Sequence, residues 1–446
     1  MTTHDTRGTR PRRRARALVA GVALATLVLG ACGGTRPEGG ATTVGVTDDS
    51  VKIGGHFPLT GVAAPGYSEI PTGAKAYYDY VNAAGGVNGR TIDYLVRDDG
   101  YDPTKTSTVT NELVLKEKIF AMVGGLGTPT HGAVVDFLND EEVPDLFVSS
   151  GSLAWGEDPA EKPWTFGWQT DYESEGKVIG QYVAKNFPDA KVGLFLQDDD
   201  LGADGEKGLQ QYIGDQVVET VRYTSGNTDV APQISALQSS GADLVIGFNT
   251  PSYTALSQLT SLKLGFKPQW FYTNVGSDAT LVGSLLSRFS EGAVKGGASS
   301  LDGVLTTKYL DTVDDADSEW IKLWKKVWEQ EGDDQPLTNY RVYGMAQAYT
   351  FVQALQAAGK DLTRQGIVDA LEEQGGDFEG PMVAPFAYSK DSHMGTTGMR
   401  VASLDGAKVV PETEVEVTEI GDNPIEPDTS DAGKDAPPAS GIPGQD

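Results

Sequence analysis

Strand-like and helix-like segments alternate along most of this chain, and this order constrains the fold more than any other feature. Short strand-like runs such as Val51–Gly55 and Ile119–Val123 end at glycines, and residues 72–84 carry apolar side chains at helical spacing. A strand, a helix and a further strand in succession are typical of a parallel sheet covered by helices. We therefore predict an α/β protein.

The alternation occurs in two successive series. The first ends near Val148, and the second begins near Asp171 and continues to about Tyr272. Two more helices and a last strand, at residues 399–404, follow. Because one unit is completed before the next begins, the order predicts two doubly wound lobes.

The N-terminus has the features of a secretory signal. A basic stretch, Arg7–Arg16, precedes an apolar run, Ala17–Leu29, that is too short to cross a bilayer comfortably. Leu29-Gly30-Ala31-Cys32 then resembles a bacterial lipobox, and Cys32 is the only cysteine of the chain. We expect residues 1–31 to be a signal peptide and Cys32 to be lipidated, which leaves no free thiol. An ordinary signal peptide with a chance cysteine, or a short core helix, is the alternative.

Two segments of biased composition flank the core. Residues 32–48 are rich in Gly and Thr and predict a flexible tether. Residues 413–446 are acidic and rich in Pro, Gly and Ser, which predicts a disordered tail. Loss of residues 1–31 removes six of 35 basic and one of 63 acidic side chains, which leaves 29 against 62, a net charge of −33. This charge argues against a nucleic-acid partner.

Several motifs follow one another in an order known from one family. Lys52-Ile53-Gly54-Gly55 leads to Pro58-Leu59-Thr60-Gly61, and Asn82–Arg90 and Asp98–Pro103 come next. With the lipobox before it, this set resembles the type I periplasmic binding proteins of the leucine/isoleucine/valine group over nearly all of residues 50–405. The resemblance implies a solute-binding protein of an ABC importer, with two lobes whose hinge closes over a small ligand.

The resemblance also implies that three crossovers join the lobes and that each lobe is discontinuous in sequence. We place the crossovers near Gln169, Ala293 and Gly398. The first lobe would then contain residues 49–169 and 294–397, and the second lobe residues 170–293 and 398–412.

Loops that follow strands are the candidate ligand contacts, because open α/β sheets bind ligands outside the carboxyl ends of their strands. The loop Gly124–Thr130 leads into a helix start, whose free N–H groups suit a carboxylate. The resemblance implies that Thr128 contacts the ligand, and Thr130 is a further candidate, although both could merely cap the helix. The resemblance also implies that Ser150 and Ser152 contact the ligand. An ordinary turn of small residues would have a similar sequence and is the alternative.

The other candidates are Tyr67, as an aromatic lid or an exposed loop tyrosine, and three residues of the second lobe. Leu201 and Thr250 stand where amino-acid-binding members have tyrosines, and Asn274 stands where those members have an acidic residue for the ligand's ammonium group. A buried ammonium group without a charged partner is costly. The departures favour aromatic or other small organic acids over branched-chain amino acids, unless Asp198-Asp199 supplies the missing carboxylate.

An enzyme is the first alternative class. His131 lies beside the proposed ligand loop, but we expect it to face solvent in the first turn of a helix. The chain has no nucleophile-elbow motif at Ser149–Ser152, no Walker motif and no G-x-G-x-x-G turn after its first strand. Asp198-Asp199-Asp200 lacks the spacing of an EF-hand. We therefore expect neither catalysis nor a metal or cofactor.

A ligand-sensing receptor module of the same fold is the second alternative. No transmembrane or signalling segment follows the core, which favours transport. We expect a monomer that is lipid-anchored outside the bacterial cell membrane and delivers a small polar solute to an ABC permease.

Overall fold

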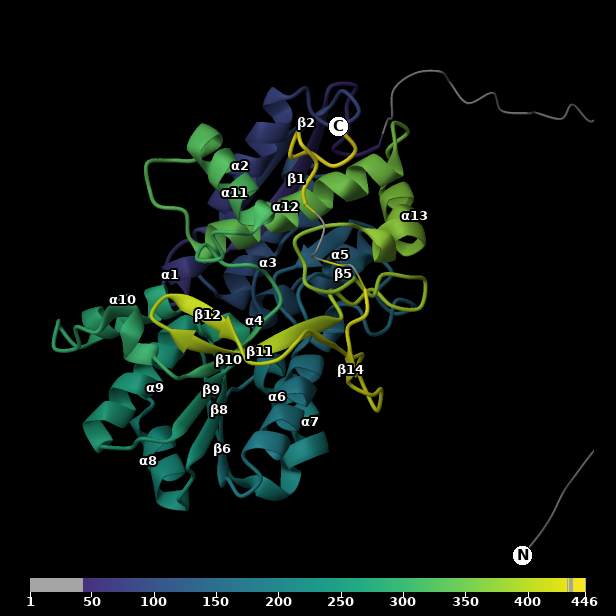
Figure 1. Cartoon of the computed structure of the whole chain (residues 1–446). Helices are drawn as coiled ribbons and strands as arrows, with labels where there is room; N and C mark the ends of the chain where they lie inside the picture. Colours follow the sequence, from purple (N-terminus) through teal and green to yellow (C-terminus); the bar gives the residue numbers. More distant parts are fainter. Residues whose placement is uncertain (1–42, 431, 433–435, 446) are drawn as a thin grey trace, which may run out of the picture. The chain divides into compact units, whose positions relative to one another are not determined.

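The computed structural model of the chain describes residues 43–430, 432 and 436–445, which lie in one compact unit, Gly40–Asp446 (Figure 1). The signal peptide and Cys32 lie outside the described residues. Within the described part, the strands form two sheets, each covered by helices, in two lobes between which the chain passes three times. The predicted α/β class and the two-lobed architecture are confirmed.

The first sheet is parallel, with the strand order β2-β1-β3-β4-β5. Alternate residues of a strand point to opposite faces. Ala121 and Val123 accordingly join the hydrophobic cluster under α2 and α12, whereas Met122 joins the cluster under η1 and α5. The strands are β1 (Ser50–Phe57), β2 (Thr91–Asp98), β3 (Ala121–Val123), β4 (Asp145–Val148) and β5 (Thr165–Gly167).

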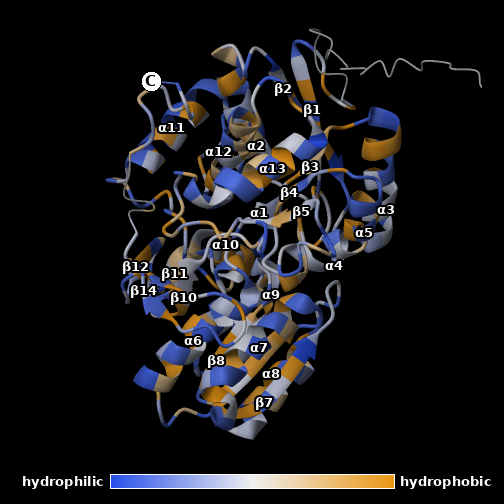
Figure 2. Ribbon diagram, turned by 90° about the vertical axis from the view of Figure 1, so that its right-hand side faces the viewer, coloured by the Kyte–Doolittle hydropathy of each residue, from blue (hydrophilic) through white to orange (hydrophobic). Residues whose placement is uncertain are grey.

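The helices of the first lobe cover both faces of this sheet, and in Figure 2 they carry hydrophilic as well as hydrophobic residues. They are α1 (Ala64–Tyr67), α2 (Ile70–Ala83), α3 (Pro103–Asn111), η1 (Glu112–Glu117), α4 (Thr128–Gly132), α5 (Val135–Asp140), η2 (Leu153–Trp155), α11 (Glu319–Glu331), α12 (Asn339–Ala358), α13 (Arg364–Gln374) and η6 (Gly375–Asp377).

The second sheet combines a parallel centre with an antiparallel edge. Its order is β14-β13-β11-β10-β9-β8-β6-β7, and β12 pairs with β11. β7, β6, β8, β9 and β10 are parallel, and the later strands are antiparallel. The strands are β6 (Val192–Gln197), β7 (Val217–Tyr223), β8 (Leu244–Phe248), β9 (Gln269–Tyr272), β10 (Leu305–Lys308), β11 (Gly398–Asp405), β12 (Lys408–Pro411), β13 (Glu416–Val417) and β14 (Glu426–Pro427).

Helices also cover both faces of the second sheet (Figure 1). Leu194 and Ile246 face the cluster that contains α6 and α7, whereas Phe195 and Val245 face the cluster that contains α8 and α9. The helices are α6 (Tyr172–Asn186), α7 (Asp200–Ile213), η3 (Gly214–Gln216), α8 (Ala231–Ser240), α9 (Pro251–Leu264), η4 (Asn274–Gly276), α10 (Ala279–Phe289) and η5 (Gly297–Leu301).

Short polar side chains fix the starts of several helices. Asp171 accepts a hydrogen bond from the backbone N–H of Ser174 at 2.7 Å at the start of α6, and Asp278 does the same for Leu281 at the start of α10. Such N-caps satisfy backbone donors that the helix itself leaves unpaired. The caps place the first turns of α6 and α10 beside the ends of neighbouring strands.

The second crossover does not lie near Ala293, as we expected. Leu305 pairs with Phe271 of β9 and with Ser403 of β11, so β10 belongs to the second sheet and the chain leaves that lobe only after Lys308. β10 is short, and all four of its residues, two of them threonines, are buried. It therefore has no polar–apolar alternation that would reveal it in the sequence. The other two passages occur between β5 and α6 and just before β11.

The predicted disorder of residues 413–446 is wrong for the residues that the structure describes. β13 and β14 extend the second sheet, and Ile442 is 1% exposed. The hydroxyl of Tyr77 on α2 donates to the carbonyl of Gly441 at 2.9 Å, and the Lys177 ammonium donates to the carbonyls of residues 419, 421 and 423. The composition of this segment describes only its side chains, whereas much of its binding to the rest of the protein is through its backbone carbonyls.

The end of the predicted tether is also ordered. Val46 is 7% exposed and bridges to Val51, and the N–H of Lys52 donates to the carbonyl of Gly45. Residues 43–48 therefore pack against β1, and residues 32–42 lie outside the described part. Among the described residues, no helix combines the length and the apolar character required to cross a bilayer.

Candidate functional site

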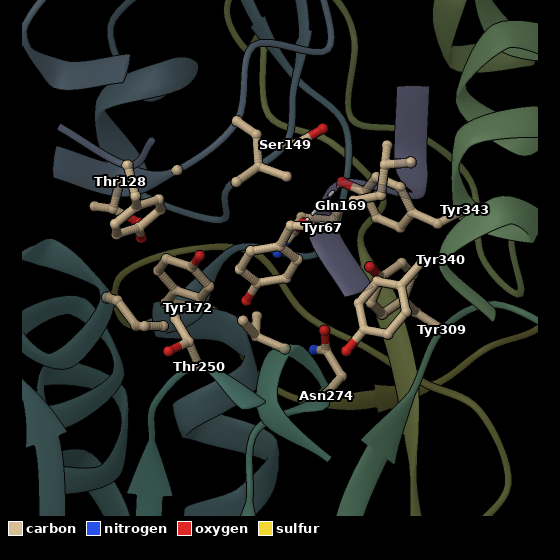
Figure 3. A pocket seen from close by; sticks show the side chains of 16 residues that line it. Tyr67, Thr128, Ser149, Gln169, Tyr172, Thr250, Asn274, Tyr309, Tyr340 and Tyr343 are labelled. Carbon is tan, nitrogen blue, oxygen red and sulfur yellow. Dashed lines mark hydrogen bonds between the residues drawn. The ribbon is translucent and has the colours of Figure 1, made fainter. Parts of the chain in front are cut away.

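A cavity with an empty volume of about 560 Å³ lies between the carboxyl ends of the two sheets. Side chains from both lobes and from the crossover segments surround it (Figure 3). The lining residues are Tyr67, Ile70, Tyr101, Leu126, Gly127, Thr128, Ser149, Gln169, Tyr172, Leu201, Thr250, Asn274, Val275, Tyr309, Tyr340 and Tyr343.

The parallel order of the strands explains why these residues meet. Thr128 lies in the segment after β3, Ser149 follows β4, Thr250 follows β8, and Asn274 follows β9. The carboxyl ends of parallel strands share one edge of a sheet, and the two such edges face each other here. Residues from distant parts of the sequence thus line one space.

The structure brings five of the eight candidate ligand contacts to the cavity, namely Tyr67, Thr128, Leu201, Thr250 and Asn274. Figure 3 shows Thr128 on the side of the first lobe and Thr250 and Asn274 on the side of the second lobe. Tyr67 is 7% exposed and packs edge-on against Tyr340, so it is not an exposed loop tyrosine.

The other three candidates lie outside the lining. The Thr130 hydroxyl donates to the Leu126 carbonyl at 2.6 Å and stabilises the loop. Ser152 caps η2 and donates to Asp200 of α7 at 3.3 Å. Ser150 shares a 2.8 Å hydrogen bond with Thr128 and therefore helps to hold the Thr128 side chain in position. Because α4 has only five residues, its dipole is small.

Six tyrosines give the cavity its character, and sequence reasoning identified only Tyr67 among them. Burial raises the pKa of Tyr172 to about 12, and burial also raises the pKa of Tyr309 and Tyr340. These phenols therefore stay protonated and combine a flat apolar face with a hydroxyl group. Their spacing in the sequence carries no signal, because they come from both lobes and from the crossovers.

No charged side chain is present among the sixteen described residues that line the cavity. A carboxylate lies directly behind the wall, at Glu175 on α6. It accepts hydrogen bonds from Thr273 Oγ1 at 2.5 Å and from the backbone and side-chain N–H groups of Asn274 at 2.9 Å each. Glu175 is fully buried, and that burial raises its pKa. It holds Asn274 in place and does not line the cavity.

Hydrogen bonds between the lobes close the cavity at its rim. The N–H of Leu153 donates to Asp204 of α7 at 3.0 Å, and Ser252 of α9 donates to the Val62 carbonyl at 2.8 Å. Asn339 at the start of α12 donates to Asp278 at 2.8 Å. The two lobes are therefore in contact around the cavity, as in a closed state.

His131 does not face solvent, contrary to expectation. It is fully buried, and its Nδ1 lies 3.0 Å from Nε2 of His56, while its Nε2 lies 2.8 Å from Asp145. His56 in turn lies 2.8 Å from Asp99. This chain of four side chains joins β1, β4, α4 and the loop after β2 beneath the cavity. Its members have no access to a ligand and act as a structural support.

Comparison with known proteins agrees with this architecture. The model of the periplasmic binding proteins matches residues 50–408. The chain is 26% identical over 339 residues to the "Leu/Ile/Val-binding protein homolog 1" of Brucella abortus strain 2308, which covers 73% of this chain and 83% of the relative.

Two solved structures show the same fold. The fatty acid ABC transporter substrate-binding protein from Thermomonospora curvata aligns with a TM-score of 0.73 at 24% identity, over 86% of this chain and 96% of that one. A solute-binding protein of an ABC transporter from R. palustris, in complex with 4-hydroxybenzoate, aligns with a TM-score of 0.67 at 20% identity, over 82% and 97% of the two chains.

Proposed function

Because this chain belongs to the periplasmic binding protein family, we propose that it captures a small organic acid in the cavity between its lobes and delivers it to an ABC permease. Binding solutes is the role of this family. Thr128, Thr250, Asn274, Leu201 and Tyr67 are the proposed ligand contacts. Ligand first meets one lobe, and the rim contacts then close over it, which requires the closed state to bind the ligand better than the open one.

We favour an organic acid over an amino acid because the described lining residues include no charged side chain. A zwitterionic amino acid needs a partner for its ammonium group, because an unpaired buried charge costs several kcal/mol. Asn274 offers only an amide where a carboxylate would be required, and Glu175 behind it is already bonded to four donors. A carboxylate can instead be held by neutral hydroxyl and amide donors.

The names of the relatives refer to several classes of ligand and do not identify the ligand of this chain. The Brucella relative is named for leucine, isoleucine and valine, and the two structural neighbours are named for a fatty acid and for 4-hydroxybenzoate. A cavity walled by tyrosines suits an aromatic or branched carbon skeleton, since phenol rings stack on flat apolar surfaces.

The protein would work outside the cytoplasm, as a monomer without catalytic activity, attached to the membrane through a lipid on Cys32. The basic stretch, the apolar run and the cysteine at residues 7–32 support this proposal. Replacing Cys32 with Ser should move the protein from the membrane fraction to the soluble fraction, measured by cell fractionation. Continued membrane association of the variant would contradict the anchor.

A thermal-shift screen tests the ligand class. A ligand at 100 times its dissociation constant should stabilise the protein by about 2.7 kcal/mol, which raises the melting temperature by several degrees. We expect shifts with aromatic or branched acids that lack an amino group. Leucine, isoleucine and valine are the matched controls, since they add only the ammonium group. A larger shift with these amino acids than with their deaminated analogues would contradict the proposal.

A further inference from the structure

The side-chain amide of Gln169 presents a donor without a partner to the cavity. Gln169 is 6% exposed, on the crossover between β5 and α6, and its Nε2 makes no hydrogen bond to any described residue. Figure 3 shows this side chain reaching toward the middle of the cavity. A buried polar group without a partner is costly. A ligand atom that accepts a hydrogen bond would remove this cost.

A relay of hydrogen bonds fixes which end of this amide faces the cavity. Nε2 of Gln347 donates to the carbonyl of Phe147 at 2.8 Å and to Oγ of Ser149 at 3.0 Å. Ser149 lies beside Tyr343, and both residues line the cavity. The Tyr343 hydroxyl donates to Oε1 of Gln169 at 3.0 Å. Oε1 is occupied, so Nε2 is the atom that faces the cavity.

The amide of Asn274, on the opposite wall, has the reverse orientation: its N–H end points away from the cavity and its oxygen points into the cavity. Its Nδ2 donates to Glu175 at 2.9 Å, and Glu175 also accepts bonds from the Asn274 backbone and from Thr307. The buried carboxylate can be reached only by the N–H end of the amide. Oδ1 of Asn274 is therefore left toward the cavity as an acceptor (Figure 3).

We propose that these two amides select the polarity of the ligand, so that it must present a hydrogen-bond acceptor to Gln169 and a donor to Asn274. This rests on the proposed function and narrows it to hydroxy acids. A carboxylate oxygen meets the N–H of Gln169, a hydroxyl meets the oxygen of Asn274, and the carbon skeleton lies among the tyrosines. An ammonium group at Gln169 would face a donor and is rejected.

Titration calorimetry with matched probes tests this selection on the full-length protein. The probes are the three hydroxybenzoates, benzoate, phenol and 4-hydroxybenzylamine, together with 2-hydroxyisovalerate and isovalerate. We expect at least one hydroxy acid to bind roughly tenfold or more tightly than the acid without its hydroxyl, because the hydroxyl pairs a group that is otherwise left unpaired. The hydroxybenzylamine should bind weakly.

Gln169→Glu keeps the shape of the side chain but replaces the donor with a negatively charged acceptor. The dissociation constant of the hydroxy acid should rise roughly a hundredfold, and that of the hydroxybenzylamine should fall. In Asn274→Ala, the hydroxy acid and the plain acid should bind equally well, because the hydroxyl has lost its partner.

Tyr343→Phe tests the relay, in which Tyr343 acts as a positioning residue. When the Tyr343 hydroxyl is removed, the Gln169 amide can rotate so that its oxygen faces the cavity. The ratio of the affinities for the acid and for the amine should therefore decrease. Tyr340→Phe is the matched control, since Tyr340 lies on the same helix and lines the same cavity outside the relay. It can alter both affinities but should preserve their ratio. This pair keeps the test valid if Gln169→Glu does not fold.

The outcomes separate the two proposals. An unchanged acid-to-amine preference in both Gln169→Glu and Tyr343→Phe would overturn the selection by the amides while leaving the proposed function intact. Wild-type protein that binds the amine as tightly as the acid would overturn the selection and also the argument that the uncharged cavity disfavours an ammonium group. Binding of no acid in the panel would contradict the proposed ligand class, and this inference with it.

Discussion

Thr128 and Thr130 show how two neighbouring residues of one type acquire different roles. Thr128 lines the cavity and shares its hydroxyl with Ser150, whereas the hydroxyl of Thr130 is committed to the carbonyl of Leu126. Both residues are buried. The sequence motif identifies both as candidates, and only the direction of each side chain distinguishes ligand contact from loop support.

The same substitution at the two positions should therefore have opposite consequences. Thr128→Val should raise the dissociation constant of the ligand roughly tenfold and should cost less stability, because Ser150 keeps its contacts with Tyr172 and with the N–H of Ser152. Thr130→Val should lower the free energy of unfolding by about 1–2 kcal/mol, because the Leu126 carbonyl loses its donor, and should change affinity less. Calorimetric titration and denaturant unfolding measure the two effects. Equal effects of the two variants on affinity would contradict this division.

The contact of α7 with the segment Ser152–Trp155 links closure of the lobes to pH. Asp204 accepts a hydrogen bond from Leu153 across the rim, and burial raises the pKa of Asp204 to about 7. The acidic groups Asp200, Asp171 and Glu157 raise this pKa further. Lys207, one turn along α7, is a cation near Asp204, but its ammonium pairs with Glu173. Opening exposes Asp204 and returns its pKa toward the ordinary value of about 4.

A carboxyl group whose pKa is higher in the closed state favours closure when it is protonated. The closed state should thus be most favoured below about pH 4 and should lose this advantage as the pH rises to about 7, with little change above that. Ligand affinity should fall from pH 5 to pH 8, by roughly tenfold after allowance for the partial exposure of Asp204. In Asp204→Asn this fall should shrink, as measured by titration at several pH values. An equally steep fall in the variant would exclude Asp204 as its source.

The C-terminal segment connects both lobes of the described unit. Lys177 on α6 of the second lobe donates to three of its carbonyls, and Tyr77 and Tyr80 on α2 of the first lobe donate to the carbonyls of Gly441 and Ser440. This segment lies beyond residue 408, where the match to the family ends.

Deleting residues 413–446 should destabilise the protein. Exposure of the surface that Ile442 covers costs about 2 kcal/mol, and the buried Lys177 ammonium loses its acceptors. Thermal unfolding measures the loss. Lys177→Met is the matched control: it should destabilise the full chain but be neutral or stabilising in the shortened chain, where no carbonyl is left to bind the ammonium. An unchanged melting temperature after deletion would contradict the packing of the tail.

The sequence by itself determined the α/β class, the two lobes and the edge at which the cavity lies. These features follow from local periodicity and from the rule that ligands bind at the carboxyl ends of parallel strands. The resemblance to the family proposed Thr128, Thr250 and Asn274 as ligand contacts, and all three lie in loops that follow strands and line the cavity.

Only the tertiary structure decided the membership of β10, the order of the tail and the chemistry of the cavity. β10 has no periodicity of its own, and the tail is held by buried donors on α2 and α6 that lie hundreds of residues away. Gln169 presents its donor to the cavity because its oxygen is bonded to Tyr343, which lies far along the chain. Such properties depend on which groups meet in space, and hydrogen-bond direction is set by partners that no local pattern contains.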